Sequence, residues 1–421
     1  MHVIAAALGV FSLYCTVTNL VPLSVGFAPL IVLVPVLFVG RRRYPEVVFS
    51  CACMLAYFAI STLIYYAPSF LQYEFYRYDG NVFTSYAPIM IYGLLSIRVR
   101  LQPLIRRFLL WVTLVDVVFI VIYAATGSTI FVSDPGIYHF LFFAHNAAGG
   151  FLSVATALAL GEWWVRRGWR EFCWMAVNGL GMALTLSVGS FIGFGMAVLI
   201  VLVMRERWLW LLILGYVALL AALLSYTYPI WEKGGEIPSQ TEYGGQAQVS
   251  GGATTDFDEA PHASHVIARI FFLWPRAVDN WLHSPIFGLG FGSYNDTPTL
   301  GYSGWDGVAA LAKPGSIQFD DSHAHHTYLH VLAETGLLGL SLLLWMLYAM
   351  WKFIHRLEPM AVRYGLLLAF WTAVWSATTE HRLFAPAEML PFTILMGLAL
   401  ANANWLRRQA RRERAPLAEA A

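Results

Sequence analysis

TYLHVLAETGLLGLSLLLWMLYAMWKFIHR, residues 327–356, is the stretch that decides the fold. Its apolar part, 327–351, is longer than the roughly 20 residues that a helix needs to cross a bilayer. Lys352 and Arg356 follow directly, as basic residues do where a helix enters the cytoplasm. We therefore predict a transmembrane helix over 327–351.

The composition of the whole chain fits the same environment. Of the 421 residues, 58% are hydrophobic and 12% are charged, whereas soluble domains carry about 25% charged residues. This excess of apolar side chains excludes a soluble enzyme. The formal charge of +1 argues against nucleic acid as a partner, because phosphate binding needs a concentrated basic face. The fold class expected is all-α and polytopic, with the lipid bilayer as a partner.

Further apolar segments give a layout of about twelve transmembrane helices. The N-terminus has no Lys or Arg before its apolar run, so it is predicted to be a retained first span and not a signal peptide. Cys15, Cys51, Cys53 and Cys173 lie in or beside apolar runs and are expected to be core residues. The predicted spans are 2–20, 22–40, 46–67, 83–97, 108–125, 139–161, 172–186, 188–204, 208–229, 327–351, 362–379 and 389–405.

The distribution of basic residues tests this layout, because Lys and Arg accumulate in cytoplasmic loops. In the predicted topology, 20 of the 26 fall on one side of the membrane. We therefore expect both termini to be cytoplasmic. The six basic residues expected on the outer side are Arg77, Lys233, Arg269, Arg276, Lys313 and Arg382.

Four regions follow from this pattern. We predict a nine-helix membrane region over 1–229, a large extracytoplasmic loop over 230–326 between helices 9 and 10, a three-helix membrane region over 327–405 and a basic cytoplasmic tail over 406–421. The loop holds eleven acidic and four basic residues, a net charge of −7. Within it, HVIARIFFLWPRAVDNWLH (265–283) mixes aromatic and aliphatic residues with single charges, which favours an interfacial amphipathic helix.

A dense polar cluster precedes the tenth predicted span, and it includes four histidines within eight residues. His326, His330 and Glu334 are four residues apart, so on a helix they share a face, a spacing that zinc ligands also use. Solvated side chains at a helix mouth explain the same spacing, and we predict no metal. A neutral histidine can instead accept a hydroxyl proton at physiological pH. The cluster is Asp320, Asp321, His323, His325, His326, His330 and Glu334.

The sequence around this cluster resembles the O-antigen ligase and polymerase family of polytopic membrane glycosyltransferases. The family signature is a His, a small amide or hydroxyl residue, nine residues and Gly-x-x-Gly, and here His325 takes the first position before Gly336-Leu-Leu-Gly339. His326 stands where the family has Asn, Ser or Gln, so the choice between the two histidines stays open. Further similar segments are Arg269-Ile-Phe-Phe-Leu-Trp, His283-Ser-Pro-Ile-Phe-Gly-Leu-Gly and Phe142-Phe-Ala-His-Asn-Ala-Ala-Gly-Gly.

The resemblance implies transfer of a glycan from an undecaprenyl-diphosphate carrier to an acceptor sugar hydroxyl, with inversion, and without a metal or another cofactor. His325 or His326 would be the base, and Arg269 and Arg276 would bind the diphosphate through guanidinium donors. Glu334, Asn146 and Tyr328 would support the site. The enzyme would lie in a bacterial inner membrane with its active site on the periplasmic side, among other polysaccharide export components.

One stretch departs from the family. The family places an Arg after a Ser between the seventh and eighth helices, but here the chain reads Thr185-Leu-Ser-Val-Gly-Ser without a basic residue. Either Arg77 or Arg382 supplies the missing charge, or the phosphate is held differently.

Several functions share the motif. The acidic loop favours a polysaccharide polymerase over a ligase that acts on phosphorylated lipid A core. A protein O-oligosaccharyltransferase and a flippase of the same lipid-linked oligosaccharide are the alternatives.

Overall fold

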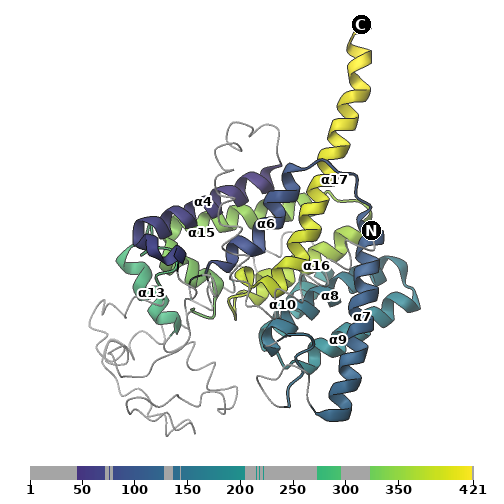
Figure 1. Ribbon diagram of the computed structural model, residues 1–421, viewed down its shortest axis with the longest axis horizontal. Helices are drawn as coiled ribbons and strands as arrows, with labels where there is room; N and C mark the ends of the chain where they lie inside the picture. Colours follow the sequence, from purple (N-terminus) through teal and green to yellow (C-terminus); the bar gives the residue numbers. More distant parts are fainter. Residues whose placement is uncertain are drawn as a thin grey trace. The chain divides into compact units, whose positions relative to one another are not determined.

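The computed structural model describes residues 45–71, 75, 79–127, 136–142, 144–203, 273–294 and 323–419, and the single positions 215, 218 and 221. Within these residues every regular element is a helix, so the all-α class is confirmed for the described part of the chain. Figure 1 shows α4 (Glu46–Tyr66), α6 (Asn81–Leu94), α7 (Leu101–Thr126), α8 (His145–Arg166), α9 (Trp169–Leu184), α10 (Val188–Val203), α13 (Trp274–His283), α15 (Thr327–Ile354), α16 (Met360–Ser376) and α17 (Pro386–Glu419), and the 3-10 helices η2 (Ala67–Leu71) and η7 (Arg382–Phe384) complete the order.

Five of the described helices are long and apolar enough to cross a membrane, so the protein is a membrane protein. They are α4, α7, α8, α15 and α17, and the shorter apolar segments are Val188–Val201 and Met360–Ser376. The predicted spans 2–20 and 22–40 and most of 208–229 lie outside the described residues. The total of twelve spans, the position of the large loop and the side on which each terminus lies therefore stay predictions.

The largest differences between helix boundaries and predicted spans are in three helices, α7, α8 and α17. α7 begins at Leu101 and not at 108, because the polar stretch after Arg100 is already helical. α8 begins at His145 and not at 139, because residues 136–142 and 144 are not helical. α17 continues to Glu419, past the predicted end at 405 and through the basic tail.

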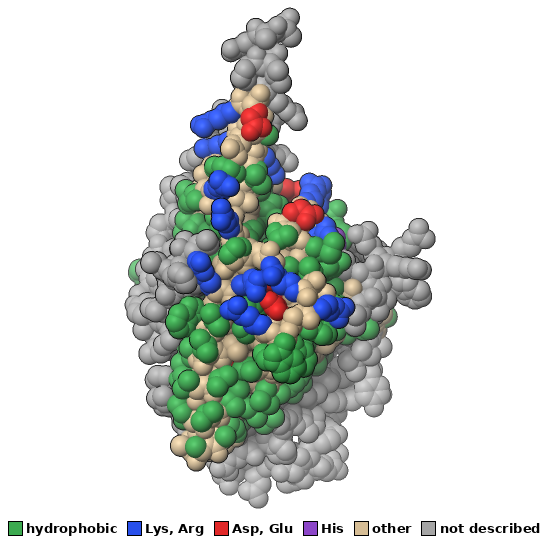
Figure 2. All heavy atoms as spheres, turned by 90° about the vertical axis from the view of Figure 1, so that its right-hand side faces the viewer, with side chains coloured by type: hydrophobic (Ala, Val, Ile, Leu, Met, Phe, Trp, Pro, Cys, Tyr) green, Lys and Arg blue, Asp and Glu red, His purple; other side chains and the backbone are tan. Residues whose placement is uncertain are grey.

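Basic side chains form a band next to an apolar surface. Figure 2 shows Lys and Arg side chains gathered above a broad apolar area and continuing along the projecting end of α17. Arg407, Arg408, Arg411 and Arg412 are exposed on that end. Such a border between basic and apolar side chains is typical of a membrane interface.

The chain divides into two compact units. The first comprises Met1–Tyr57, Phe70–Leu202 and Leu342–Ala421. In it α8 packs against α9, α16 and α17, and α17 packs against α6. Every side chain of α8 from Ala148 to Glu162 is buried, as expected for a central helix. Gly161 approaches the backbone of Gly365 so closely that a side chain would not fit, which lets α8 and α16 pack tightly.

The second unit comprises Phe58–Ser69 and Val203–Ser341. Its central feature is a kink in α15 at Gly336, where φ is 61° and ψ is −166°. The kink exposes backbone groups that pair with the segment after α13. Leu337 N–H donates to Pro285 C=O (2.9 Å), and Gly290 N–H donates to Glu334 C=O (2.8 Å). The two glycine motifs noted in the sequence, Gly288-Leu-Gly290 and Gly336-Leu-Leu-Gly339, therefore lie in close backbone contact. We call this contact the glycine lock.

The glycines of this lock have a steric reason. A Cβ at Gly288 would overlap the backbone of Glu334, and a Cβ at Gly336 would overlap the backbone of Ile286. Both glycines also have positive φ, a conformation that other residues rarely adopt. The close backbone contact explains why glycine is found at both positions.

Candidate functional site

The accessible part of the histidine cluster lies just before α15 in the second unit. His323 and His325 are half-buried, and their ring centroids are 4.3 Å apart. His325 has φ 47°, which is uncommon for a residue with a side chain and costs energy that the surrounding structure must supply. Strained backbone of this kind is often found where a side chain must point in one direction for function. Tyr328, in the first turn of α15, is also half-buried.

His326 has a different role from its neighbour. It is buried, and its Nδ1 accepts a hydrogen bond from Leu329 N–H (3.2 Å), which is the bond that an N-cap side chain makes. Its ring also contacts Trp274 edge-on, with centroids 5.4 Å apart. Burial lowers the pKa of His326 from 6.5 to about 3. A group with so low a pKa stays neutral but is a weak acceptor of a hydroxyl proton.

His330 and Glu334 share a face of α15, as their spacing predicts. His330 Nε2 lies 3.3 Å from Glu334 Oε2, and both side chains are fully buried. Glu334 Oε1 accepts a hydrogen bond from Tyr294 N–H (2.9 Å), and the rings of Tyr294 and His330 lie 5.1 Å apart. Glu334 therefore ties α15 to the end of the glycine-rich segment. His326 is less suited to zinc than its spacing suggests, because its Nδ1 already accepts the capping hydrogen bond from Leu329 N–H.

Arg276 belongs to the same buried network. Its Nη2 donates to Tyr294 C=O (2.6 Å), and its guanidinium lies over the Tyr294 ring at 4.6 Å. Tyr294 in turn donates its hydroxyl to Leu273 C=O (2.9 Å). Arg276 thus uses part of its guanidinium to hold Tyr294, at the end of the glycine-rich segment. Two other predicted diphosphate ligands, Arg77 and Arg269, lie outside the described residues.

A second polar cluster lies in the first unit around Arg382. This side chain is 4% exposed, and its guanidinium donates to the Asn146 carbonyl and to Ser187 Oγ (3.0 Å). Its Nε lies 3.8 Å from Glu388 Oε2. Ser376 Oγ donates to the other oxygen of Glu388 (2.7 Å). Arg382 is therefore held between α8, the start of α10 and the start of α17.

The surroundings of Arg382 carry further positive potential. Asn146 is in the first turn of α8 and Ser187 directly precedes α10, so the guanidinium lies at the N-termini of two helices. Helix N-termini carry a partial positive charge and expose N–H donors. A Cβ at Gly150 would lie 2.9 Å from Arg382 Nη1, so glycine is needed for this approach. A guanidinium beside two helix N-termini is an arrangement suited to an anion.

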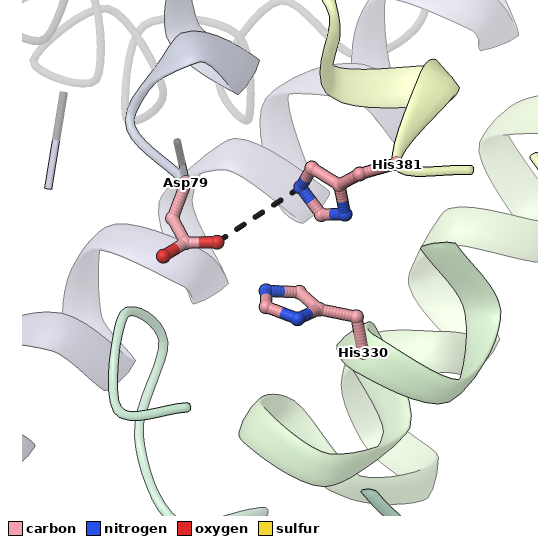
Figure 3. Close-up of side chains that lie close together, drawn as sticks. All are labelled: Asp79, His330 and His381. Atoms are coloured by element: carbon pink, nitrogen blue, oxygen red, sulfur yellow. Dashed lines mark ion pairs between the residues drawn. The ribbon is translucent and has the colours of Figure 1, made fainter. Parts of the chain in front are cut away.

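Two residues that sequence reasoning did not single out lie near this cluster. His381 Nε2 is 3.9 Å from Asp79 Oδ1, and both side chains are buried (Figure 3). The segment that carries His381 is fixed because Ser85 Oγ donates to Phe384 C=O (2.8 Å) and the Phe384 ring contacts the His381 ring. The charged tripeptide Glu380-His381-Arg382 between two apolar helices was a signal that could have found His381 but not Asp79.

Comparison with known protein families gives a match for part of the chain. Residues 172–344 match the family model described as O-antigen ligase. This match covers less than half of the chain, and it supports a similarity of that part to O-antigen ligases. The search of curated proteins gives no match. The O-antigen ligase family groups membrane glycosyltransferases of the ligase and polymerase type.

The part of the chain matched to O-antigen ligase contains the histidine cluster, the glycine lock and Arg276, but not Arg382 or Asn146. It also contains Thr185–Ser190, where the family's Arg is missing. Arg382, one of the two predicted replacements, donates to Ser187 within this stretch. The O-antigen ligase segment and a residue outside it thus contribute to one polar cluster of the first unit.

Proposed function

We propose that this protein is a glycosyltransferase that moves a glycan repeat unit from undecaprenyl diphosphate to a sugar hydroxyl of an acceptor glycan. The acceptor oxygen attacks the anomeric carbon, a C–O bond forms, and the bond from that carbon to the diphosphate oxygen breaks. The diphosphate leaves on the lipid, and the acceptor proton passes to a base. Attack opposite the leaving group inverts the anomeric configuration, and the step requires neither a metal nor another cofactor.

His325 is the base in this proposal. The observation that carries the assignment is the contrast between two adjacent histidines, because His326 Nδ1 caps α15 and is buried, whereas the His325 ring is half-exposed. A general base must reach its substrate and have a pKa near the working pH. His326 meets neither requirement, since burial lowers its pKa to about 3.

Arg382 is proposed as a ligand of the diphosphate, and Arg276, Arg269 and Arg77 are the further candidates. Its support is the position at the N-termini of α8 and α10, where helix dipoles add to the guanidinium charge. Glu388 offsets part of this charge in the absence of an anion. Asn146 supports Arg382, Glu334 supports the glycine-rich segment through Tyr294, and Tyr328 supports the site from the first turn of α15.

A polymerase of an exported polysaccharide is favoured over a ligase because the segment 230–326 has a net charge of −7. A protein O-oligosaccharyltransferase would use the same chemistry on another acceptor. A flippase would need polar groups along a path through the membrane. The proposed location is a bacterial inner membrane, with both termini cytoplasmic, the site on the periplasmic face and other export components as neighbours.

The test compares glycan output in strains that carry wild type, His325→Ala or Arg382→Ala, with membrane abundance measured by immunoblot. Loss of polymer at normal abundance, with lipid-linked repeat units accumulating on the outer face, is expected for His325→Ala. Retention of single-repeat products with loss of longer chains identifies a polymerase. Unchanged product contradicts His325 as the base, and repeat units that stay on the cytoplasmic face support the flippase instead.

A further inference from the structure

The segment that follows α13 lies far along α15. Leu337 and Leu338 are about ten residues after the start of α15 at Thr327, which corresponds to roughly 15 Å along a helix. Leu337 N–H bonds to Pro285 C=O, and Leu338 N–H bonds to Ile286 C=O (3.1 Å). These bonds place residues 285 and 286 beside α15, within the length of a candidate membrane span.

Non-helical backbone survives at this depth only if its polar groups are satisfied. The kink at Gly336 meets this requirement, because it frees groups of α15 that the segment then uses. Leu289 N–H donates to Ala333 C=O (3.3 Å), Gly290 N–H donates to Glu334 C=O, and Gly288 N–H donates to Ser284 C=O (2.8 Å). The segment can therefore enter the hydrocarbon region and return.

On the α4 side, the same segment is clamped by specific contacts. Thr62 Oγ1 donates to Phe291 C=O (3.0 Å), and Phe291 N–H donates to Ser61 Oγ (3.1 Å). The rings of Phe58 and Phe291 stack with centroids 4.5 Å apart. The segment is thus held between two membrane helices of the second unit.

The tip of this segment is apolar and exposed. Ile286 is 59% exposed and Phe287 is 62% exposed, next to Leu337 at 47%. Exposed apolar side chains at membrane depth contact hydrocarbon. The tip therefore presents an aromatic and a branched side chain to a lipid tail.

We propose that residues 284–291 form a re-entrant segment whose tip, Ile286 and Phe287, binds the polyprenyl tail of the lipid carrier. This inference rests on the proposed function, which supplies a lipid diphosphate as the donor. The same unit carries His325 at the outer end of α15 and Arg276 on α13, about two helical turns before the segment begins. A carrier whose diphosphate lies at that end has its tail along the first 15 Å or so of α15, where Ile286 and Phe287 are exposed.

The first arm of the test is photocrosslinking in membranes that contain a radiolabelled undecaprenyl-diphosphate repeat unit. p-Benzoylphenylalanine is placed at position 287 or, as control, at position 118 of α7, where Val118 is 55% exposed. We expect labelling by the isoprenoid at least several-fold stronger at 287 than at 118. Equal labelling at the two positions, or crosslinks at 287 to phospholipid alone, overturns the polyprenyl assignment.

The second arm measures depth without any activity assay. A nitroxide is attached at Ile286→Cys and, as control, at Arg411→Cys, which lies on the exposed end of α17, after the four native cysteines are replaced by alanine. We expect high oxygen and low nickel-complex accessibility at 286, and the reverse at 411. High nickel accessibility at 286 overturns the re-entrant placement.

The two proposals fail separately. If the His325→Ala and Arg382→Ala proteins still transfer glycan while position 287 crosslinks to the isoprenoid, the catalytic assignment fails and the tail surface stands. If a protein that transfers glycan shows no preferential crosslink at 287, the tail surface fails alone.

Discussion

The two polar clusters of this protein differ in how they are assembled. Most of the cluster of the second unit lies within one short stretch of sequence, His323 to Glu334, and Arg276 and Tyr294 join it from nearby segments. The cluster of the first unit brings Asn146, Ser187, Arg382 and Glu388 together from separate helices. A local cluster can be found by its density in the sequence, whereas a dispersed one becomes visible only when the helices are packed.

The comparison also separates accessible groups from groups that hold the fold. In the second unit, His325 is accessible, while His326, His330 and Glu334 are buried in capping and ion-pair contacts. In the first unit, Arg382 is buried like the groups that hold the fold, but it also lies at two helix N-termini, where an anion is favoured. A variant of the first cluster should therefore lose activity without losing stability only if the charge of Glu388 is removed together with that of Arg382.

The largest effect is expected for Arg382→Ala. Removing the guanidinium leaves Glu388 buried without its ion-pair partner, which costs about 3–5 kcal/mol of stability. The double variant Arg382→Ala/Glu388→Gln should recover abundance, because neither charge remains, but should not recover transfer. Immunoblots and a transfer assay on the same membranes measure both. Full activity of the double variant would show that Arg382 has only a structural role.

A somewhat smaller effect is expected for Gly336→Ala. The added Cβ meets the backbone of Ile286, and the backbone conformation, which is nearly restricted to glycine, costs an alanine about 1–3 kcal/mol before that overlap is counted. The thermal midpoint of the purified protein should fall. Gly195→Ala is the matched control, because no atom lies within 4 Å of its Cβ and alanine favours a helix. Equal midpoints for the two variants would contradict the glycine lock.

The cap at His326 predicts a dependence of stability on acid. Its folded-state pKa of about 3 lies below the ordinary value of 6.5, so the folded state binds fewer protons than the unfolded state. This contribution to stability is complete above about pH 6.5 and is lost as the pH falls toward 3.

The variant His326→Asn tests this dependence, because asparagine caps helices without titrating. The drop in thermal midpoint between pH 7 and pH 5 should be smaller in His326→Asn than in wild type. An identical drop would remove His326 as its source.

The smallest effect is expected for Ser187→Ala. The hydroxyl accepts one of several hydrogen bonds of Arg382, so its loss should cost about 1 kcal/mol. Transfer should persist, since the other contacts of Arg382 remain. Thermal melting and the transfer assay on purified protein detect the difference. A loss as large as that of Arg382→Ala would make Ser187 itself a ligand of the anion.

Much of the fold followed from the sequence because membrane spans have a strong local signal. The predicted spans 46–67, 327–351 and 389–405 each lie almost entirely within a helix. Boundaries such as the start of α8 at His145 did not follow, because the apolar residues 138–144 are compatible with either state. The kink at Gly336 was also hidden, since a single glycine in a helix is read as tolerated until its neighbour Ile286 is known.

The candidate site was predictable in part for the same reason. His325 and His326 were found from the density of polar residues around them, but only the capping hydrogen bond from Leu329 N–H distinguishes the two side chains. Arg382 was predicted as a candidate from its side of the membrane, whereas its bond to Ser187 depends on the packing of separate helices. Glu388 and Asp79 gave no motif, because each is a single polar residue beside an apolar helix, whereas His381 could have been found from the charged tripeptide Glu380-His381-Arg382.

The most direct test of the central claim is transfer by purified His325→Ala and His326→Asn proteins, with undecaprenyl diphosphate release from a lipid-linked repeat unit as the readout. The proposal predicts a loss of about 10²-fold or more for His325→Ala, as expected for removal of a general base, and a change within a few-fold for His326→Asn. Near-normal release by His325→Ala, with loss in His326→Asn, would contradict it and transfer the role of base to the buried histidine.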